Sequence, residues 1–266
     1  LAEVQATAEQ MKWEATTIAP TLLRHVGPNA FRASMRETLA GALPIASQSP
    51  PSSHTLVRLL RYDRDALERI VLALAYDTTF EFHAEARLAS LKKLNASELA
   101  QIVTKSLSHR GEHDPAPRAF ESSSVTLELD LDYGAYRDLQ RHRMLTPSTQ
   151  LLSCSLGAML PDDVDSLGVR AAYQAALDQA AEVWSELEKV DPFAAQYVVP
   201  LAFRVRTLWT LNLRQLFYVV ELRSARQGHA NYRRVAQEIY RQVCTVHPWL
   251  KDLIRVDLQD HRLART

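Results

Sequence analysis

The clearest hydrophobic pattern in the chain lies at residues 124–132, where apolar and polar side chains alternate. The apolar set is Val125, Leu127, Leu129 and Leu131, and the polar set is Thr126, Glu128, Asp130 and Asp132. Because successive side chains of a strand point to opposite faces, this pattern predicts a strand over Ser124–Asp132 with one buried and one wet face. Two less regular segments, Leu56–Tyr62 and Phe203–Leu211, are predicted as further strands.

Most of the remaining pattern has helical spacing. Asp65 precedes an apolar stripe and is predicted to cap a helix that runs to about Ala75, and Asn95 with Glu98 is predicted to open another as a capping box. Further helices are predicted over residues 79–94, 168–190, 214–226 and 229–246, and over a segment that ends at Arg143. Strands and helices mix without regular βαβ alternation, so the pattern predicts a helix-rich α+β fold.

Residues 44–54 divide the chain. This segment is rich in proline and serine and has almost nothing to bury, so it is predicted to be a linker. We therefore expect a helical N-terminal extension over residues 1–43 and a compact domain over residues 55–266. The chain begins at Leu1 rather than at a methionine, which is consistent with a piece of a longer protein.

The charge balance excludes some classes of partner. The chain has 31 Lys and Arg and 31 Asp and Glu, so no net charge draws it to nucleic acid or to an anionic membrane surface. No apolar stretch reaches the length of a membrane span, and no signal peptide is visible. Cys154 and Cys244 stand alone, as ordinary buried thiols of a reducing compartment do, so a cytoplasmic location is expected.

Two common kinds of ligand site have no sequence support. Only 7 glycines occur in 266 residues, and neither of the usual glycine-rich phosphate loops is present. A nucleotide would therefore be held by side chains, with arginine the natural choice.

His109 and His113 lie four residues apart, but no third ligand follows at a suitable spacing, so no metal site is expected.

Arginine is concentrated in two segments. In the first, Arg141 and Arg143 flank His142 at the end of a predicted helix, and Arg137 lies one turn earlier on the face of Arg141. Two guanidinium groups on one face suit a phosphate or an ionised base placed between them. A basic helix C-terminus that complements its own dipole explains the same residues, and both interpretations remain open.

The second arginine segment follows the predicted strand that ends at Leu211. Arg214 and Arg223 lie nine residues apart on one predicted helix, so they point to different sides and one helix can touch two bound groups. The residues between them are apolar enough to be held in a core. An unpaired guanidinium beside a core costs on the order of several kcal/mol, so Arg223 is expected to have a partner.

These segments together resemble the flavin-dependent thymidylate synthases. Arg141-His142-Arg143, with Ser148 and Gln150 downstream, is similar to the RHR signature of that family. The other matching segments, in the family's order, are Phe120-Glu121, Ala195–Leu201, Trp209–Arg214, Leu222-Arg223 and His229-Ala230. Val57–Tyr62 and Ala75–Asp77 also fit, so the resemblance spans about residues 56–245.

The resemblance implies a homotetrameric α+β fold with a small antiparallel sheet, flanking helices and FAD bound between subunits. It implies methylene transfer from methylenetetrahydrofolate via the flavin to dUMP, with NADPH as the reductant. The residues that it assigns to FAD are Glu121, Arg141, His142, Arg143, Asn212, Arg214 and Tyr218. Those that it assigns to the nucleotide are Arg141, Ser148, Gln150, Gln196 and Arg223. Arg223 is also the catalytic candidate, because a fixed cation at the uracil edge favours the ionised base and makes its carbon nucleophilic without an enzyme cysteine.

Several positions depart from the family's pattern. Ser153 and Gln196 stand where the family has arginines for the substrate phosphate, Asp138 where it has glutamine, and Tyr218 where it has histidine or asparagine. Two lost charge-assisted hydrogen bonds, at about 1.5–3 kcal/mol each, weaken dUMP binding by about two to four decades. Three interpretations stay open: a dUMP methyltransferase, an FAD-binding protein with another substrate, and a non-catalytic domain that supports an oligomer or a partner.

Overall fold

The computed structural model describes residues 2–27, 29–42, 55–80 and 82–261, and the chain divides into two compact units, Leu1–Ser53 and His54–Thr266. The first unit contains α1 (Ala2–Ile18), α2 (Pro20–Leu23) and α3 (Ala30–Ala42). Within its described residues, neither α1 nor α2 buries a side chain. The Pro/Ser-rich segment predicted to be a linker, residues 44–54, lies outside the described residues.

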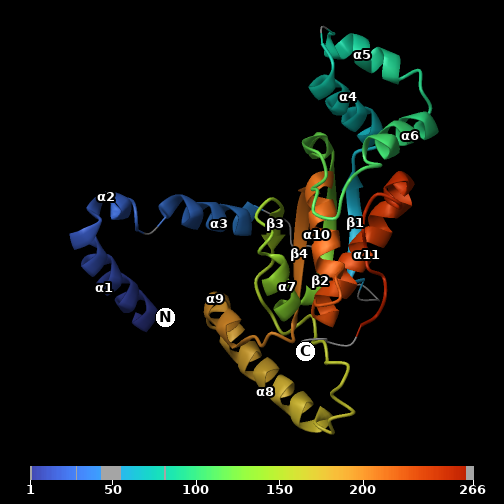
Figure 1. The fold of residues 1–266 in the computed structure, drawn as a ribbon. Helices are drawn as coiled ribbons and strands as arrows, with labels where there is room; N and C mark the ends of the chain where they lie inside the picture. Colours follow the sequence, from blue (N-terminus) through green and yellow to red (C-terminus); the bar gives the residue numbers. More distant parts are fainter. Residues whose placement is uncertain (1, 28, 43–54, 81, 262–266) are drawn as a thin grey trace. The chain divides into compact units, whose positions relative to one another are not determined.

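The second unit is built on a four-stranded antiparallel sheet (Figure 1). Its strands are β1 (Val57–Tyr62), β2 (Ser124–Asp132), β3 (Thr146–Thr149) and β4 (Arg204–Asn212), in the spatial order β1-β2-β4-β3. The two long strands pair over their whole length, with Leu127 opposite Trp209. The strand predicted at Ser124–Asp132 is therefore confirmed, and it is one of the two central strands.

Helices supply most of the rest of this unit. They are α4 (Ala66–Thr78), α5 (Ala84–Leu91), α6 (Ala96–Ser106), α7 (Tyr133–Leu139), α8 (Arg170–Glu188), α9 (Pro192–Ala195), α10 (Leu213–Ser224) and α11 (Ala230–Val246), with 3-10 turns η1 (Arg118–Ser122), η2 (Gln196–Val198) and η3 (Pro248–Leu250). The helix predicted from residue 79 begins only at Ala84, because β-branched and aromatic residues precede it. The predicted helix-rich α+β fold with a small antiparallel sheet is confirmed. None of the helices in the described part of the chain combines the length and the apolar character that a membrane span requires.

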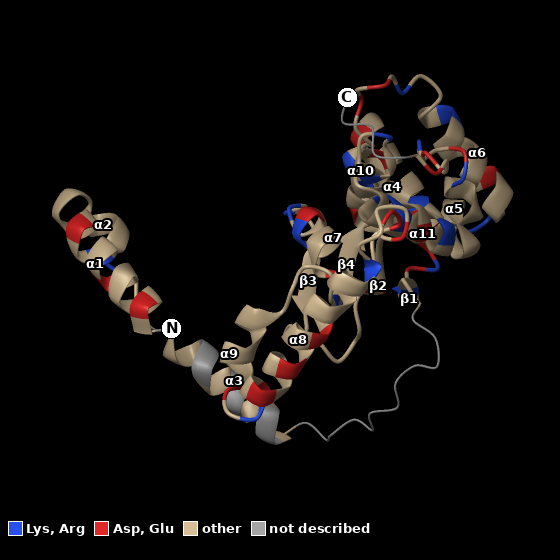
Figure 2. Cartoon of the chain, turned by 90° about the horizontal axis from the view of Figure 1, so that it is seen from below, with Lys and Arg blue, Asp and Glu red and all other residues tan. Residues whose placement is uncertain are grey.

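The main hydrophobic core joins the sheet to α4, α6, α10 and α11. The four aliphatic residues of β2 are buried there together with Trp209 and Phe217. Burying one such side chain stabilises the fold by about 1.5–3 kcal/mol relative to leaving it exposed. A smaller cluster around Cys154, Leu177 and Phe203 holds α8. The acidic residues of this helix, red in Figure 2, are exposed. The helix predicted over residues 168–190 is thus confirmed as α8.

The wet face predicted for β2 is wrong at its C-terminal end, where Asp130 and Asp132 are buried. Asp130 accepts a hydrogen bond from Arg206 at 3.0 Å and lies 3.6 Å from Arg204, and both arginines belong to the neighbouring strand β4. Asp132 accepts from the backbone nitrogen of Ala135 at 2.8 Å and so caps α7. A buried charge is stable when it is paired, and polarity along the sequence does not distinguish a paired carboxylate from a solvated one.

The helix predicted to end at Arg143 ends four residues earlier. α7 stops at Leu139, Gln140 takes the C-terminal cap position, and Arg141-His142-Arg143 lies in the turn that leads to β3. Strand β3 was not predicted, because its four residues are all exposed and include Pro147. No alternation of buried and exposed positions marks such a strand in the sequence.

Two predicted helix caps behave differently. At α6, Asn95 accepts from the backbone nitrogen of Glu98 at 3.0 Å and donates its own backbone N–H to the Glu98 carboxylate at 2.8 Å, so the capping box is confirmed. At α4, Asp65 occupies the cap position, but its carboxylate accepts from the side chain of Arg69 at 2.9 Å and makes no cap bond to the backbone. The predicted cap at Asp65 is therefore correct in position and wrong in its hydrogen bond.

Replacing Asn95 with alanine is expected to lower the free energy of unfolding by about 1 kcal/mol, the usual contribution of an N-cap hydrogen bond. Asp65→Ala is the matched control, because Asp65 also lies at a helix cap position but makes only an exposed ion pair with Arg69. Losing such a pair is expected to lower the free energy of unfolding by less than about 0.5 kcal/mol. Urea denaturation followed by circular dichroism compares the two variants. Equal losses of stability would contradict the role assigned to the capping box.

Candidate functional site

Helix α10 organises the site because it starts directly at the end of a central strand. β4 ends at Asn212, whose side chain accepts from the backbone nitrogen of Gln215 at 2.8 Å and caps the helix. The side of α10 that packs in the core is apolar and buried: Leu213, Leu216, Phe217, Val219 and Val220. Arg214 and Arg223 contact different parts of the protein from this helix, as their spacing predicts.

A cavity of about 580 Å³, here named the first cavity, lies along the Arg214 side of α10. Four of the residues that the resemblance assigns to the cofactor line it: Glu121, Asn212, Arg214 and Tyr218. Arg214 donates to a Glu121 carboxylate oxygen and to the carbonyl oxygen of Ala116, each at 2.8 Å. Arg118 also pairs with Glu121, and the hydrogen bonds from Arg118 and then Arg214 hold the pKa of Glu121 below its usual value. The carboxylate therefore stays ionised and fixes Arg214 at the cavity wall.

Another wall of the first cavity comes from residues 110–116, a loop without a predicted site residue. Arg110 donates two hydrogen bonds to the Glu221 carboxylate, at 2.8 and 2.7 Å, and one to the carbonyl oxygen of Asp114 at 2.9 Å. The Arg110 side chain is only 8% exposed, and a bidentate pair of this kind fixes both partners. The pair ties the loop to α10. No periodic signal marks Arg110 in the sequence, because its partner is distant along the chain.

His142 and Arg223 form a pair at the centre of the site. Nε of Arg223 donates to Nε2 of His142 at 2.8 Å, and His142 is 4% exposed. Because a guanidinium only donates, Nε2 of the neutral ring is the acceptor and carries no proton. Burial, followed by the charge of Arg223, lowers the pKa of His142 to about 4. The ring is therefore neutral near pH 7 and serves as an acceptor for Arg223.

The Arg223–His142 pair lies between two cavities. Nη2 of Arg223 donates to the carbonyl oxygen of Asp138 at 2.9 Å, and its guanidinium lies 5.4 Å from the centre of the Tyr232 ring. Asp138 and Tyr232 line another cavity, of about 370 Å³, here named the second cavity. On the other side, His142 packs edge-on against Tyr218, with ring centres 5.3 Å apart, and Tyr218 lines the first cavity. The partner expected for Arg223 is thus present, in the form of two acceptors.

Arg141 and Arg143, which the resemblance assigns to FAD, are exposed in the turn after α7 and do not line the first cavity. Arg141 lies 3.8 Å from a carboxylate oxygen of Asp138. The shared helix face predicted for Arg137 and Arg141 is wrong, because α7 ends between them. Of the three residues of the RHR segment, only His142 is buried.

The residues assigned to the nucleotide are spread more widely. Ser148 on β3 and Gln150 just after it are exposed. Gln196 accepts a hydrogen bond from the backbone nitrogen of Leu152 at 3.0 Å, so its side chain holds a loop. Among the residues that the structure describes, no group of three His, Cys, Asp or Glu side chains is arranged to hold a metal ion.

Two solved structures share the fold of this chain. Flavin-dependent thymidylate synthase ThyX from Helicobacter pylori, complexed with FAD and dUMP, aligns with a TM-score of 0.55 and 16% identity, over 76% of this chain and 100% of that chain. The UMP/dUMP methylase PolB from Streptomyces cacaoi, bound with 5-Br dUMP, aligns with a TM-score of 0.59 and 17% identity, over 75% of this chain and 96% of that chain. At these identities the likeness establishes the fold.

Sequence relatives place the chain in a family. It is 32% identical to a UPF0159 protein of Chlamydia muridarum and 30% identical to one of Chlamydia pneumoniae, in both cases over 100% of this chain and 52% of the relative. It is 32% identical to a UPF0159 protein of Thermoplasma acidophilum, over 79% of this chain and 43% of the relative, so it spans about half the length of the curated relatives it matches. The family described as thymidylate synthase complementing protein matches residues 58–249. The chain therefore belongs to the thymidylate synthase complementing protein family.

Proposed function

We propose that this chain binds FAD in the first cavity and takes part in methyl transfer to a pyrimidine nucleotide, with methylenetetrahydrofolate as the donor and NADPH as the reductant. One observation carries the proposal: Glu121, Asn212, Arg214 and Tyr218, which the resemblance assigns to the cofactor, line a single cavity. The solved structural relatives support the same class of reaction, since one holds FAD and dUMP and the other is a UMP/dUMP methylase.

The residues of the first cavity fit a flavin. Its volume of about 580 Å³ lies within the range of about 300–1,000 Å³ that is usual for small-molecule sites. Met144 and Leu222 offer apolar surface for a flat ring, and the Asn212 amide nitrogen and the Arg214 guanidinium offer hydrogen-bond donors. The Arg214 side chain is 35% exposed, so part of its guanidinium is accessible to a ligand.

When bound, FAD supplies the carrier for the transferred one-carbon group. The contribution of the chain is a fixed cation, because Arg223 is held by the His142 ring and the Asp138 carbonyl. A cation fixed beside a pyrimidine base lowers the pKa of the base, and the ionised base is a stronger carbon nucleophile. Cys154 is unsuited to nucleophilic attack, because burial raises the pKa of its thiol to about 11 and little thiolate is present near pH 7.

The two positions at which the resemblance implies arginines for the substrate phosphate favour a second candidate function. Gln196 holds the backbone of Leu152, and the hydroxyl of Ser153 lies 2.9 Å from that of Ser155. Both positions that carry phosphate arginines in the family are thus neutral here and engaged in local contacts. An FAD-binding domain that acts on another substrate, or one that supports a partner domain, fits these substitutions.

The oligomer that we propose is a homotetramer, as the resemblance implies. Arg141 and Arg143 are exposed on this chain, which makes them available to the first cavity of another copy. Such an arrangement would bring the two arginines to the cofactor although they do not line the cavity of their own chain.

Arg214→Ala is expected to weaken FAD binding by about 10- to 100-fold, because a charge-assisted hydrogen bond contributes about 1.5–3 kcal/mol. Arg118→Ala is the matched control: it removes the other guanidinium that pairs with Glu121, and its side chain is 80% exposed and outside the cavity. Titration with FAD, followed by flavin fluorescence, gives both dissociation constants. Absence of FAD binding by the unaltered chain, or equal losses in the two variants, would overturn the proposal.

Gln196→Arg combined with Ser153→Arg is expected to tighten dUMP binding by at least about tenfold, the effect of one restored charge-assisted hydrogen bond. The double variant also loses the acceptor for Leu152, at a cost of about 1 kcal/mol in stability. Tyr197→Arg adds a charge at an exposed neighbouring position and should leave dUMP binding unchanged. Calorimetry measures all three proteins. Tight dUMP binding by the unaltered chain would show that other residues hold the phosphate and would rule against the second candidate.

Lowering the pH is expected to destabilise the protein through His142. Its pKa is about 4 in the fold and about 6.5 in the unfolded chain, so the unfolded chain binds the proton first as the pH falls. The stabilisation is fully present above about pH 6.5 and is lost towards pH 4, and the shift corresponds to about 3 kcal/mol. His142→Asn should flatten this part of the pH dependence. Urea denaturation at pH 7 and pH 5 tests it, and identical pH dependence in both proteins would refute the assignment.

A further inference from the structure

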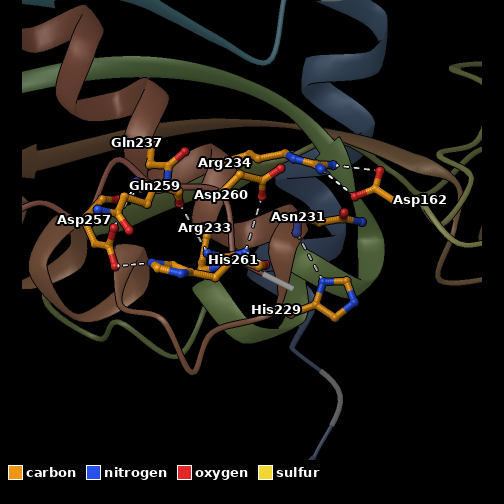
Figure 3. Close-up of polar contacts among 10 residues, drawn as sticks. All are labelled: Asp162, His229, Asn231, Arg233, Arg234, Gln237, Asp257, Gln259, Asp260 and His261. Atoms are coloured by element: carbon orange, nitrogen blue, oxygen red, sulfur yellow. Dashed lines mark hydrogen bonds and ion pairs between the residues drawn. The ribbon is translucent and has the colours of Figure 1, made fainter. Parts of the chain in front are cut away.

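The second cavity, of about 370 Å³, forms where α7, the start of α11 and the segment around Met159 meet. Its size lies within the range of about 300–1,000 Å³ that is usual for small-molecule sites. Figure 3 shows its border at the start of α11, where the backbone nitrogen of Asn231 donates to His229 and the side chain of Arg234 is paired with Asp162. Because the charge of Arg234 is paired with Asp162, this guanidinium is not available to bind an anion in the cavity.

Two aromatic rings of this cavity, with the Arg223 guanidinium next to one of them, suit a planar heterocycle. Tyr173 of α8 and Tyr232 of α11 both belong to its lining, and the Arg223 guanidinium lies 5.4 Å from the centre of the Tyr232 ring. Arg223 uses Nε for His142 and Nη2 for the Asp138 carbonyl. Within the described residues its Nη1 carries no further hydrogen bond, so it remains a donor for a ligand. Aromatic faces beside a fixed donor are typical of sites that hold a nucleobase.

The carboxylates of the cavity disfavour a phosphate. Asp132 is buried and accepts from Ala135 and Asn231 at 2.8 and 3.0 Å, so hydrogen bonds within the fold hold its carboxylate in place. Asp138 is 43% exposed and lies 3.8 Å from the exposed Arg141. In the part of the chain that the structure describes, no lysine or arginine lines the cavity. The two carboxylates that line the cavity repel a phosphate dianion. A carboxylate readily accepts hydrogen bonds from sugar hydroxyls.

We propose that the second cavity binds the base and the sugar of a pyrimidine nucleoside that carries no 5′-phosphate. Asp138 accepts hydrogen bonds from the sugar hydroxyls, and Arg223 lies at the edge of the base. Ser153 and Gln196 fit the same ligand, because they replace cations that a nucleoside does not need. The choice of a pyrimidine rests on the proposed function, and the preference for an uncharged ligand rests on the charges of the cavity.

Isothermal titration calorimetry on the full chain, with and without FAD, tests the proposal with uridine, 2′-deoxyuridine and their 5′-monophosphates. Each nucleoside is expected to bind at least about tenfold more tightly than its monophosphate. Asp138→Asn keeps the backbone carbonyl that holds Arg223 but removes the negative charge, so the preference for the nucleoside should fall by at least about tenfold. Asp178→Asn, on the exposed side of α8 and outside the cavity, should leave the preference unchanged.

The outcomes separate this inference from the proposed function. A preference for nucleosides in a chain that binds no FAD supports the inference and removes the proposed function. FAD binding together with equal or tighter binding of the monophosphates overturns the inference and leaves the proposed function in place. Failure to bind either ligand class also overturns the inference. If Asp138→Asn does not fold, the comparison of nucleoside and monophosphate on the unaltered chain decides alone.

Discussion

The fixed guanidinium of Arg223 is the interaction on which the site depends. A cation beside a hydrophobic core is stable only where acceptors are already in place, and here they are the His142 ring and the Asp138 carbonyl. The ring accepts because it is neutral, with a pKa lowered to about 4 chiefly by its burial. A protonated imidazole would repel the guanidinium and lose its acceptor. The burial of His142 therefore keeps its ring a hydrogen-bond acceptor, and this acceptor fixes the position of the Arg223 guanidinium.

The sheet in turn sets the distance between this cation and its acceptors. β2 and β4 are antiparallel neighbours, and each ends in a side chain that caps the next helix, Asp132 for α7 and Asn212 for α10. The two caps therefore lie at opposite ends of the strand pair. α7 and α10 start from these opposite ends, and the hydrogen bonds of Arg223 join the end of α10 to the end of α7 and the turn after it (Figure 1). A change in the β2–β4 register would separate Arg223 from both acceptors.

Features that depend on near neighbours could be predicted from the sequence, and features that depend on distant partners could not. The capping box at Asn95 and the alternation in β2 each involve residues only a few positions apart. The burial of Asp130 depends on Arg206, and the cavity wall at Arg110 depends on Glu221, 111 residues away. No periodicity encodes such partners. The resemblance assigned Arg214 and Arg223 to the site, but only the fold shows that Arg214 lines the first cavity, whereas Arg223 is held by His142 and by the carbonyl of Asp138, which lines the second.

The glutamine at position 196 has a structural role, so it is more than the loss of an arginine. Its side-chain oxygen accepts from the backbone nitrogen of Leu152 at 3.0 Å. A guanidinium has no acceptor, so an arginine at this position leaves that nitrogen without its partner. The loop that begins at Leu152 leads into the small cluster of Cys154, Val199 and Phe203 that holds α8. At a position where the resemblance implies a cation, this chain has a side chain that orders a loop, and this supports the uncharged ligand that we propose for the second cavity.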